Sequence, residues 1–222
     1  MLPQLRIAAL AAVAMAAAGC SPDAPPAPPI DGGPISQGLS ISWESRPATF
    51  PGSPSADLTI ERAVFHQDEL RVVSDAGPID LDLDELVWER GVAPTALPVM
   101  GALPGLYSRL LFELEGDDDD RDREYAYEIT GTVRVNGTFR PFTIRDTGDL
   151  SLSLDFSITL PPGGTARIPV RIEIDEIVTA VDFSQVQIQD NRYIVEKGNS
   201  QLTNVRAAVR GSFGVSSASG PS

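Results

Sequence analysis

The feature that most constrains the fold is a run of apolar–polar alternation between residues 150 and 174. Its first half reads LSLSLDFSITL, its second half reads ARIPVRIEI, and Pro161-Pro162-Gly163-Gly164 lies between them. A period of two places alternate side chains on opposite faces of a strand, and turn residues of this kind reverse the chain. The run therefore predicts two long antiparallel strands, paired as a hairpin, with one buried and one solvated face.

Shorter segments of the same kind recur between residues 39 and 145, separated by turns and loops. We expect strands at 39–46, 57–66, 69–74, 79–83, 106–114, 125–135 and 138–145. The strands before and after Gln67-Asp68 are expected to meet at a tight turn there. Asn136-Gly137 favours a two-residue hairpin turn, because both positions take positive φ. Asp84–Arg90 is compatible with one helical turn capped by Asp84.

The C-terminal part is less regular. Residues 185–188 and 193–195 are compatible with a small hairpin around Asp190-Asn191. Residues 200–213 fit either a helix or a strand, and the abundance of Ala and Arg favours the helix.

The fold class follows from many short strands with frequent turns and little helix. This pattern predicts a mainly β protein, an antiparallel β-sandwich of immunoglobulin-like or transthyretin-like kind with at most one C-terminal helix. A partly open β-barrel is the alternative. We expect one β-rich domain over residues 39–215 and a flexible tail over 216–222.

The N-terminus carries a different signal. A short segment with Arg6 precedes an apolar run of twelve residues, 7–18, which is too short to span a bilayer as a helix but suits a signal peptide. The run ends in Ala17-Ala18-Gly19-Cys20, and Cys20 is the only cysteine of the chain.

These four residues resemble the lipobox of bacterial lipoproteins, although that family most often has Leu where this chain has Ala17. The resemblance implies that residues 1–19 are a signal peptide and that Cys20 becomes the lipidated first residue of the mature protein. Ser21 after the cysteine then favours the outer membrane. The alternative is ordinary cleavage after Ala16-Ala17-Ala18, which leaves a free Cys20 thiol.

A proline-rich segment separates Cys20 from the predicted domain. Residues 21–38 read SPDAPPAPPIDGGPISQG, with six prolines and few apolar side chains. Such a composition does not build a core and predicts an extended tether over residues 20–38, reaching on the order of 55 Å at about 3.1 Å per residue.

Charge narrows the range of partners. The chain has 31 acidic and 17 basic residues, a net charge of −14. Nucleic acids and anionic headgroups require basic patches, so neither is an expected partner. A single cysteine cannot form an internal disulfide, so an apolar core must stabilise the domain.

Residues that could carry chemistry are few. His66 is the only histidine, and no HxxH, HExxH or GxSxG pattern is present. We therefore expect no enzyme and no cofactor, and interpret His66 as a rim residue at a turn. The alternative is an envelope enzyme such as a glycan hydrolase, which needs only two carboxylates.

Two acidic groups and one aromatic group are weak binding candidates. Calcium favours acidic loops, and the densest acidic stretch comprises Asp117, Asp118, Asp119, Asp120 and Asp122. Asp80, Asp82 and Asp84 would share one face of a strand, spaced about 7 Å apart. We interpret both groups as solvated surface. A glycan platform could use Trp43, Trp88, Tyr107, Tyr125 and Tyr127, but core packing is favoured for these rings.

The middle of the chain carries a second resemblance. Ile79-Asp80-Leu81 and the segment from Leu103 through Pro104-Gly105-Leu106-Tyr107 to Arg109 resemble predicted bacterial surface lipoproteins of unknown function. The resemblance implies a β-sandwich and no catalytic residues. The sequence thus predicts a membrane-anchored envelope lipoprotein, a non-enzymatic binding or structural module whose partner is an envelope protein or a glycan.

Overall fold

The computed structural model describes residues 38–116 and 125–216. The predicted signal peptide, Cys20, nearly all of the predicted tether, the calcium candidates Asp117–Asp120 and Asp122, and the predicted tail beyond residue 216 lie outside these residues. The described strands are β1 (Gly38–Arg46), β2 (Gly52–Ser55), β3 (Leu58–Ser74), β4 (Gly77–Leu81), β5 (Glu85–Trp88), β6 (Leu97–Val99), β7 (Gly105–Leu114), β8 (Tyr127–Val135), β9 (Thr138–Asp146), β10 (Leu150–Leu160), β11 (Thr165–Glu173), β12 (Ile188–Gln189), β13 (Arg192–Val195) and β14 (Phe213–Val215). The helices are α1 (Ile174–Thr179), the 3₁₀ turn η1 (Phe183–Gln185) and α2 (Leu202–Ser212).

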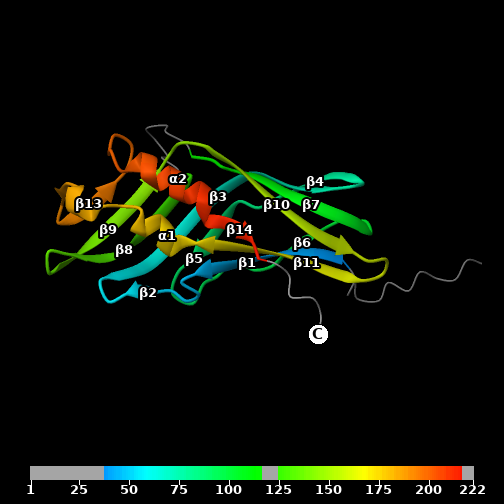
Figure 1. The fold of residues 1–222 in the computed structure, drawn as a ribbon, viewed down its shortest axis with the longest axis horizontal. Helices are drawn as coiled ribbons and strands as arrows, with labels where there is room; N and C mark the ends of the chain where they lie inside the picture. The colour runs from blue at the N-terminus through cyan, green and yellow to red at the C-terminus, as the bar shows by residue number, and fades with distance from the viewer. Residues whose placement is uncertain (1–37, 117–124, 217–222) are drawn as a thin grey trace, which may run out of the picture. The chain divides into compact units, whose positions relative to one another are not determined.

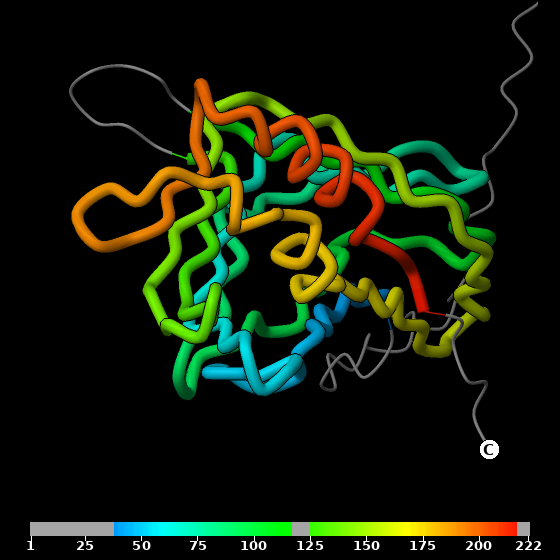
Figure 2. Tube along the Cα trace, turned by 60° about the vertical axis from the view of Figure 1, so that its left-hand side comes forward, coloured from blue at the N-terminus to red at the C-terminus, as the bar shows by residue number. Residues whose placement is uncertain are grey.

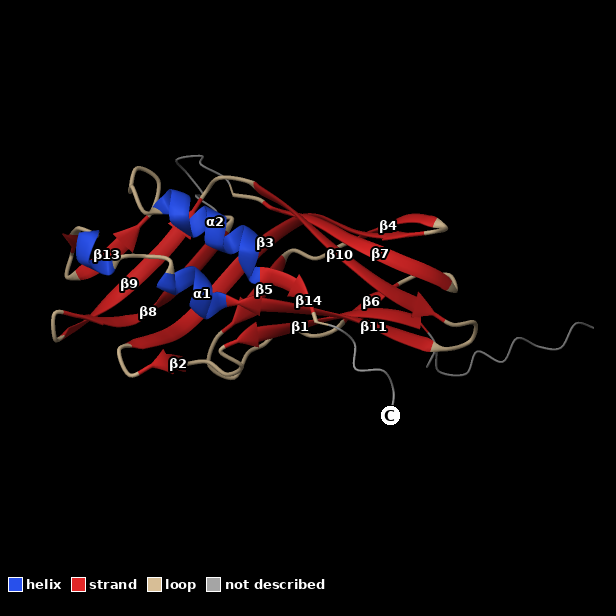
Figure 3. Cartoon of the chain, viewed as in Figure 1, coloured by secondary structure: helices blue, strands red, loops and turns tan. Residues whose placement is uncertain are grey.

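The strands form two sheets in a sandwich-like arrangement, which confirms the predicted mainly β class (Figures 1 and 3). The smaller sheet has the order β14-β11-β1-β6. The larger has the order β10-β7-β3-β8-β9-β13-β12, and β2, β4 and β5 pair with β3. The described strands do not close into a barrel.

The alternating run 150–174 forms its two strands, but the predicted hairpin pairing is wrong. Strand β10 pairs antiparallel with β7 in the larger sheet, whereas β11 pairs parallel with β1 in the smaller sheet. The turn at Pro161–Gly164 therefore connects the two layers of the sandwich. Alternation specifies only which side chains of a strand face the core. Two strands that lie in opposite sheets, with the core between them, show the same alternation as two strands paired in a hairpin.

Strand β3 corrects a second prediction. The expected strands 57–66 and 69–74 are one 17-residue strand, without a turn at Gln67-Asp68. An irregularity with Glu69 at φ 49° bends it instead. At the middle of β3 the His66 N–H donates to Ala126 O and the His66 carbonyl accepts from Glu115 N–H, so the end of β7 and the start of β8 meet along one edge of β3.

The core is closed by aromatic contacts between the sheets. Phe213 of β14 lies 5.5 Å from the Phe65 ring of β3 and 5.3 Å from the Phe112 ring of β7, between ring centroids. Each of these rings is buried. Because Phe213 follows α2 directly, this contact also positions the helix.

Helices α1 and α2 lie side by side over one side of the sheets (Figure 2). The predicted C-terminal helix is confirmed as α2, with Val205 and Val209 fully buried. The helical turn proposed for Asp84–Arg90 is wrong, because Glu85–Trp88 pairs with β3 as β5. Helix α1 replaces the expected end of the strand at Ile174.

Candidate functional site

Two of the surface grooves lie at opposite ends of the domain, and a third, of about 300 Å³, lies on β3, β7 and β10. The β1 groove measures about 500 Å³ and is lined by Gly38, Leu39, Ser40, Pro98, Val99, Met100, Gly101, Ala102, Thr165 and Ala166. The glutamine groove measures about 430 Å³ and is lined by Gln185, Gln187, Gln189, Ile194, Glu196, Lys197, Gly198, Asn199 and Ser200. Figure 1 shows β13, beside the glutamine groove, at one end, and β4, β6 and the β10–β11 connection at the other.

The glutamine groove lies between the segment before β13, residues 185–189, and the turn after β13, residues 196–200. Gln185 ends the 3₁₀ turn η1, Gln187 follows it and Gln189 lies in β12, and all three are exposed. The Asn199 side chain is used internally, since its amide donates to Ile194 O at 3.3 Å and its oxygen accepts from Gln201 N at 2.9 Å. The glutamines thus supply the amide groups that a ligand could reach.

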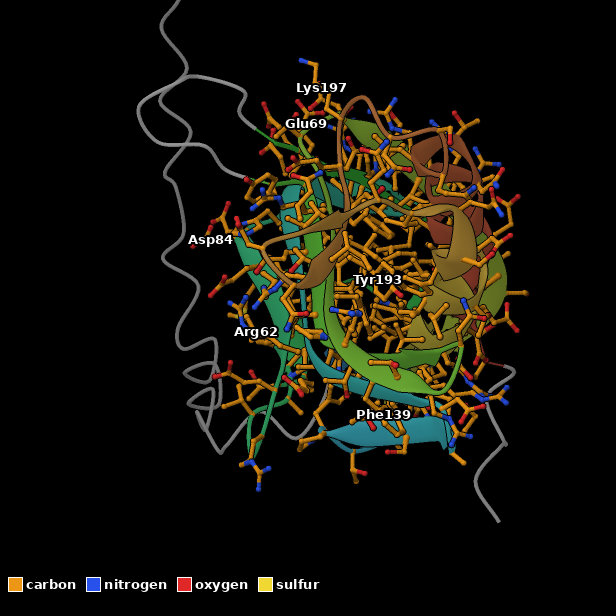
Figure 4. The ribbon with its side chains drawn as sticks, turned by 90° about the vertical axis from the view of Figure 1, so that its left-hand side faces the viewer. Arg62, Glu69, Asp84, Phe139, Tyr193 and Lys197 are labelled. Carbon is orange, nitrogen blue, oxygen red and sulfur yellow. The ribbon has the colours of Figure 1, made fainter. Side chains whose placement is uncertain are left out.

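Aromatic side chains support this groove from below. Phe183 lies 5.3 Å from Phe142 and 5.6 Å from Tyr193, between ring centroids, and all three rings are buried. Figure 4 looks onto this end of the domain, with Tyr193 directed into the interior and Lys197 at the rim. The groove can therefore exchange hydrogen bonds with an uncharged polar ligand, but it offers no exposed ring for stacking.

A buried ion pair positions the elements behind the glutamine groove. Arg206 of α2 donates from Nε and Nη2 to Asp146 at the end of β9, at 2.6 and 2.8 Å. The Asp146 side chain is fully buried and also accepts from the Tyr127 hydroxyl and the Gly148 N–H. Burial and the Asp146 charge raise the pKa of Tyr127 far above its ordinary value. This cluster fastens α2 to the larger sheet.

Acidic side chains gather at the junction of β3, β7 and β10. Asp68 hydrogen-bonds to Glu115, and this bond together with the Asp68 charge raises the pKa of the Glu115 carboxyl. Asp149 lies beside them and accepts weakly from Gly116 N–H at 3.4 Å. The predicted calcium residues follow Gly116 directly but lie outside the described residues.

The Asp68–Glu115 pair is the closest match to the carboxylates of the alternative, a glycan hydrolase. A general acid does need a raised pKa. However, Asp68 and Glu115 are exposed and line neither end groove nor the groove on β3, β7 and β10, although their neighbours Glu69 and Glu113 line the latter. The Asp68 and Glu115 carboxyl groups hydrogen-bond to each other, whereas those of retaining enzymes lie roughly 5 Å apart. The geometry therefore gives this alternative no specific support.

The other predicted site residues are not brought together. Among the described residues, no three His, Cys, Asp or Glu side chains form a metal-binding group. Asp80 lies in β4 and pairs with Arg71 at 2.5 Å, whereas Asp82 and Asp84 lie in the following loop rather than on one strand face. His66 lies half-buried in the middle of β3, not at a turn.

The proposed aromatic platform does not exist in this structure. Trp43, Trp88, Tyr107 and Tyr127 are all buried, as the core-packing interpretation expected. Tyr125 is half-buried, with the Arg145 guanidinium 4.8 Å from its ring centroid.

Sequence reasoning missed both the glutamine groove and the Asp146–Arg206 pair. The spacing of Gln187 and Gln189 was a usable signal, because alternate polar side chains share one side of an extended segment, whereas Gln185 belongs to the 3₁₀ turn η1. Asp146 and Arg206 are sixty positions apart, and nothing local marks either residue as buried.

Comparisons of the chain with known protein families, curated proteins and solved structures find no significant match. Within residues 38–116 and 125–216, neither helix has the length and hydrophobicity needed to cross a membrane.

Proposed function

We propose that this chain is a lipid-anchored protein of the bacterial cell envelope, held by Cys20 and displaying a non-enzymatic binding domain. The observation that carries the proposal is the position of the only cysteine. It follows a twelve-residue apolar run and small residues, and a proline-rich segment separates it from β1 at Gly38. A diacylated or triacylated cysteine holds a protein stably at a bilayer, whereas a single chain gives only marginal binding.

The glutamine groove favours a binding role over a purely structural one. Its amides suit an uncharged polar partner, either a glycan or the backbone of another envelope protein. The groove lies at the opposite end of the domain from Gly38, where the proposed tether joins. A partner at this end would meet the domain without steric interference from the anchor.

The Cys20→Ser variant tests the anchor. The serine hydroxyl cannot accept the thioether-linked diacylglyceryl group, so we expect the variant to leave the membrane fraction and appear in the soluble fraction. Ser21→Ala is the matched control, with an equally small change next to the same site, and it should remain with the membranes. An unchanged membrane pool for Cys20→Ser would overturn the proposal.

A further inference from the structure

Three large apolar side chains project from the β6–β7 loop and the first residues of β7, beside the β1 groove. Met100, Leu103 and Leu106 are 72%, 60% and 42% exposed, and they are half of the six large hydrophobic residues exposed within the described part of the chain. Residues 97–107 contain no charged side chain. Apolar surface gathered in this way marks a contact site more often than a single exposed side chain does.

The loop is held in place and cannot simply fold its apolar side chains inward. The Tyr107 hydroxyl donates to Leu103 O at 2.7 Å, and Asp75 N–H donates to Leu106 O at 3.0 Å. The strand before the loop, β6, pairs with β1 through Leu39 and Val99. The exposed side chains thus stand on a fixed backbone.

The chain enters the domain at this same place. Gly38 begins β1, lines the β1 groove, and donates its N–H to Gly164 O at 3.1 Å. Only seventeen residues, 21–37, separate it from Cys20. An anchor at Cys20 therefore keeps this end within the reach of the tether, on the order of 55 Å when fully extended, and such tethering raises the effective concentration of the loop at the lipid surface.

The neighbouring turn also lacks charge. Residues 160–166 read LPPGGTA, and every residue that lines the β1 groove is uncharged. The chain as a whole carries −14, so anionic headgroups would repel most of its surface. Exposed Asp75 lies against Leu106 and is the charge nearest the loop, but residues 97–107 and 160–166 together give an uncharged surface that can approach a bilayer at low electrostatic cost.

We propose that Met100, Leu103 and Leu106 insert into the outer part of the bilayer that holds Cys20, so that the domain rests on lipid with the β1 groove facing the membrane. This inference depends on the proposed lipid anchor. It adds an orientation, in which the glutamine groove faces away from the membrane.

A tryptophan placed in the loop tests the contact. The full-length Leu103→Trp variant is attached to vesicles of phosphatidylethanolamine and phosphatidylglycerol, with or without acyl-chain-brominated lipid, in two ways: through its natural lipid, and through coupling of the unlipidated Cys20 thiol to a maleimide lipid. Phe139→Trp is the matched control, because Phe139 is 56% exposed at the start of β9, at the end of the domain away from the β1 groove. The native Trp43 and Trp88 are buried and set the background.

We expect brominated lipid to quench the Leu103→Trp variant at least about twofold more strongly than the control, because bromine quenches only rings that reach the acyl region. Adding Met100→Ser and Leu106→Ser should reduce this difference, while the thermal melt confirms folding. Equal quenching of the Leu103→Trp and Phe139→Trp variants in the maleimide arm would overturn the inference.

The two arms separate the two proposals. If Cys20 carries no natural lipid, the first arm fails to attach but the maleimide arm still reports insertion. A blue-shifted Leu103→Trp spectrum without lipid, insensitive to bromine, would mean that the tether or a second copy covers the loop. A concentration-dependent shift identifies the second copy, and either result contradicts lipid insertion.

Discussion

The two ends of the domain differ in chemistry although both belong to the same pair of sheets. At the β1 groove, uncharged turns are joined by backbone hydrogen bonds such as Gly38 to Gly164, and apolar side chains are exposed. At the glutamine groove, charged side chains join the elements, for example Arg145 to Glu196 at 2.6 Å. Turn residues contribute little to the core, so each end can carry a surface suited to a different environment.

The ends also differ in what holds them together. The β1 groove is formed by strands and the loop after β6, without a helix, whereas the glutamine groove adjoins α2, which the Asp146–Arg206 pair fastens to β9. Damage to that pair should therefore weaken one end and spare the other.

Arg206→Ala is expected to have the largest effect. It leaves the Asp146 carboxylate buried without its main partner, which costs about 3 kcal/mol of unfolding free energy, the lower end for buried pairs because the Arg206 side chain is 40% exposed. Urea denaturation measures the loss, and hydrogen exchange should locate it in α2 rather than β6.

Arg210→Ala is the control for this variant, since Arg210 lies one turn later on the same helix and is exposed. Equal destabilisation by the two substitutions would show that the buried pair does not distinguish the two ends.

Alkaline pH should separate two buried tyrosines. Burial raises the pKa of Tyr107 near the β1 groove, and burial plus the Asp146 charge raises that of Tyr127 much further. A tyrosine whose folded pKa is raised stabilises the protein fully below its unfolded pKa of about 10, and this contribution is lost as the pH rises above that value.

The free energy of unfolding of the unmodified protein should fall between about pH 9 and pH 11, and Tyr127→Phe should reduce this fall more than Tyr107→Phe does. Thermal melts across this range measure the two slopes. A steeper remaining slope in the Tyr127→Phe variant than in the Tyr107→Phe variant would contradict the stronger coupling at Asp146.

Arg109→Ala is expected to have the smallest effect. Arg109 pairs with Asp155 at 2.7 Å on the outer face of β7 and β10, where both side chains are at least half exposed. Such pairs contribute less than about 1 kcal/mol, and salt screens them. A loss as large as that of Arg206→Ala, in the same denaturation assay, would mean that burial is not what makes the Asp146 pair strong.

Sequence alone located most strands, because alternation reports directly which face of a segment is buried. It could not assign partners to them. Leu152 and Ile168 satisfy the same burial condition whether β10 and β11 pair as a hairpin or face each other across the core. The continuous β3 was missed because Gln67-Asp68 has a turn-like composition, whereas pairing on both edges keeps the strand extended.

The candidate site was less predictable than the fold. His66 and the acidic groups drew attention as residue types, but the strands do not bring them together as a metal site among the described residues. The Asp146–Arg206 pair depends on how α2 packs against β9, and no local pattern encodes that contact. Only the glutamines that line the glutamine groove could be recognised in the sequence. The groove itself also needs the turn after β13, which the fold brings beside them.

The most direct test of the whole account is the intact mass of the protein purified from envelope membranes. We predict a chain that begins at Cys20 and carries a thioether-linked diacylglyceryl group, with further mass for an acylated amine. A chain that retains residues before Cys20, or one with a free Cys20 thiol that still fractionates with membranes, would contradict the lipid anchor and the orientation inferred from it.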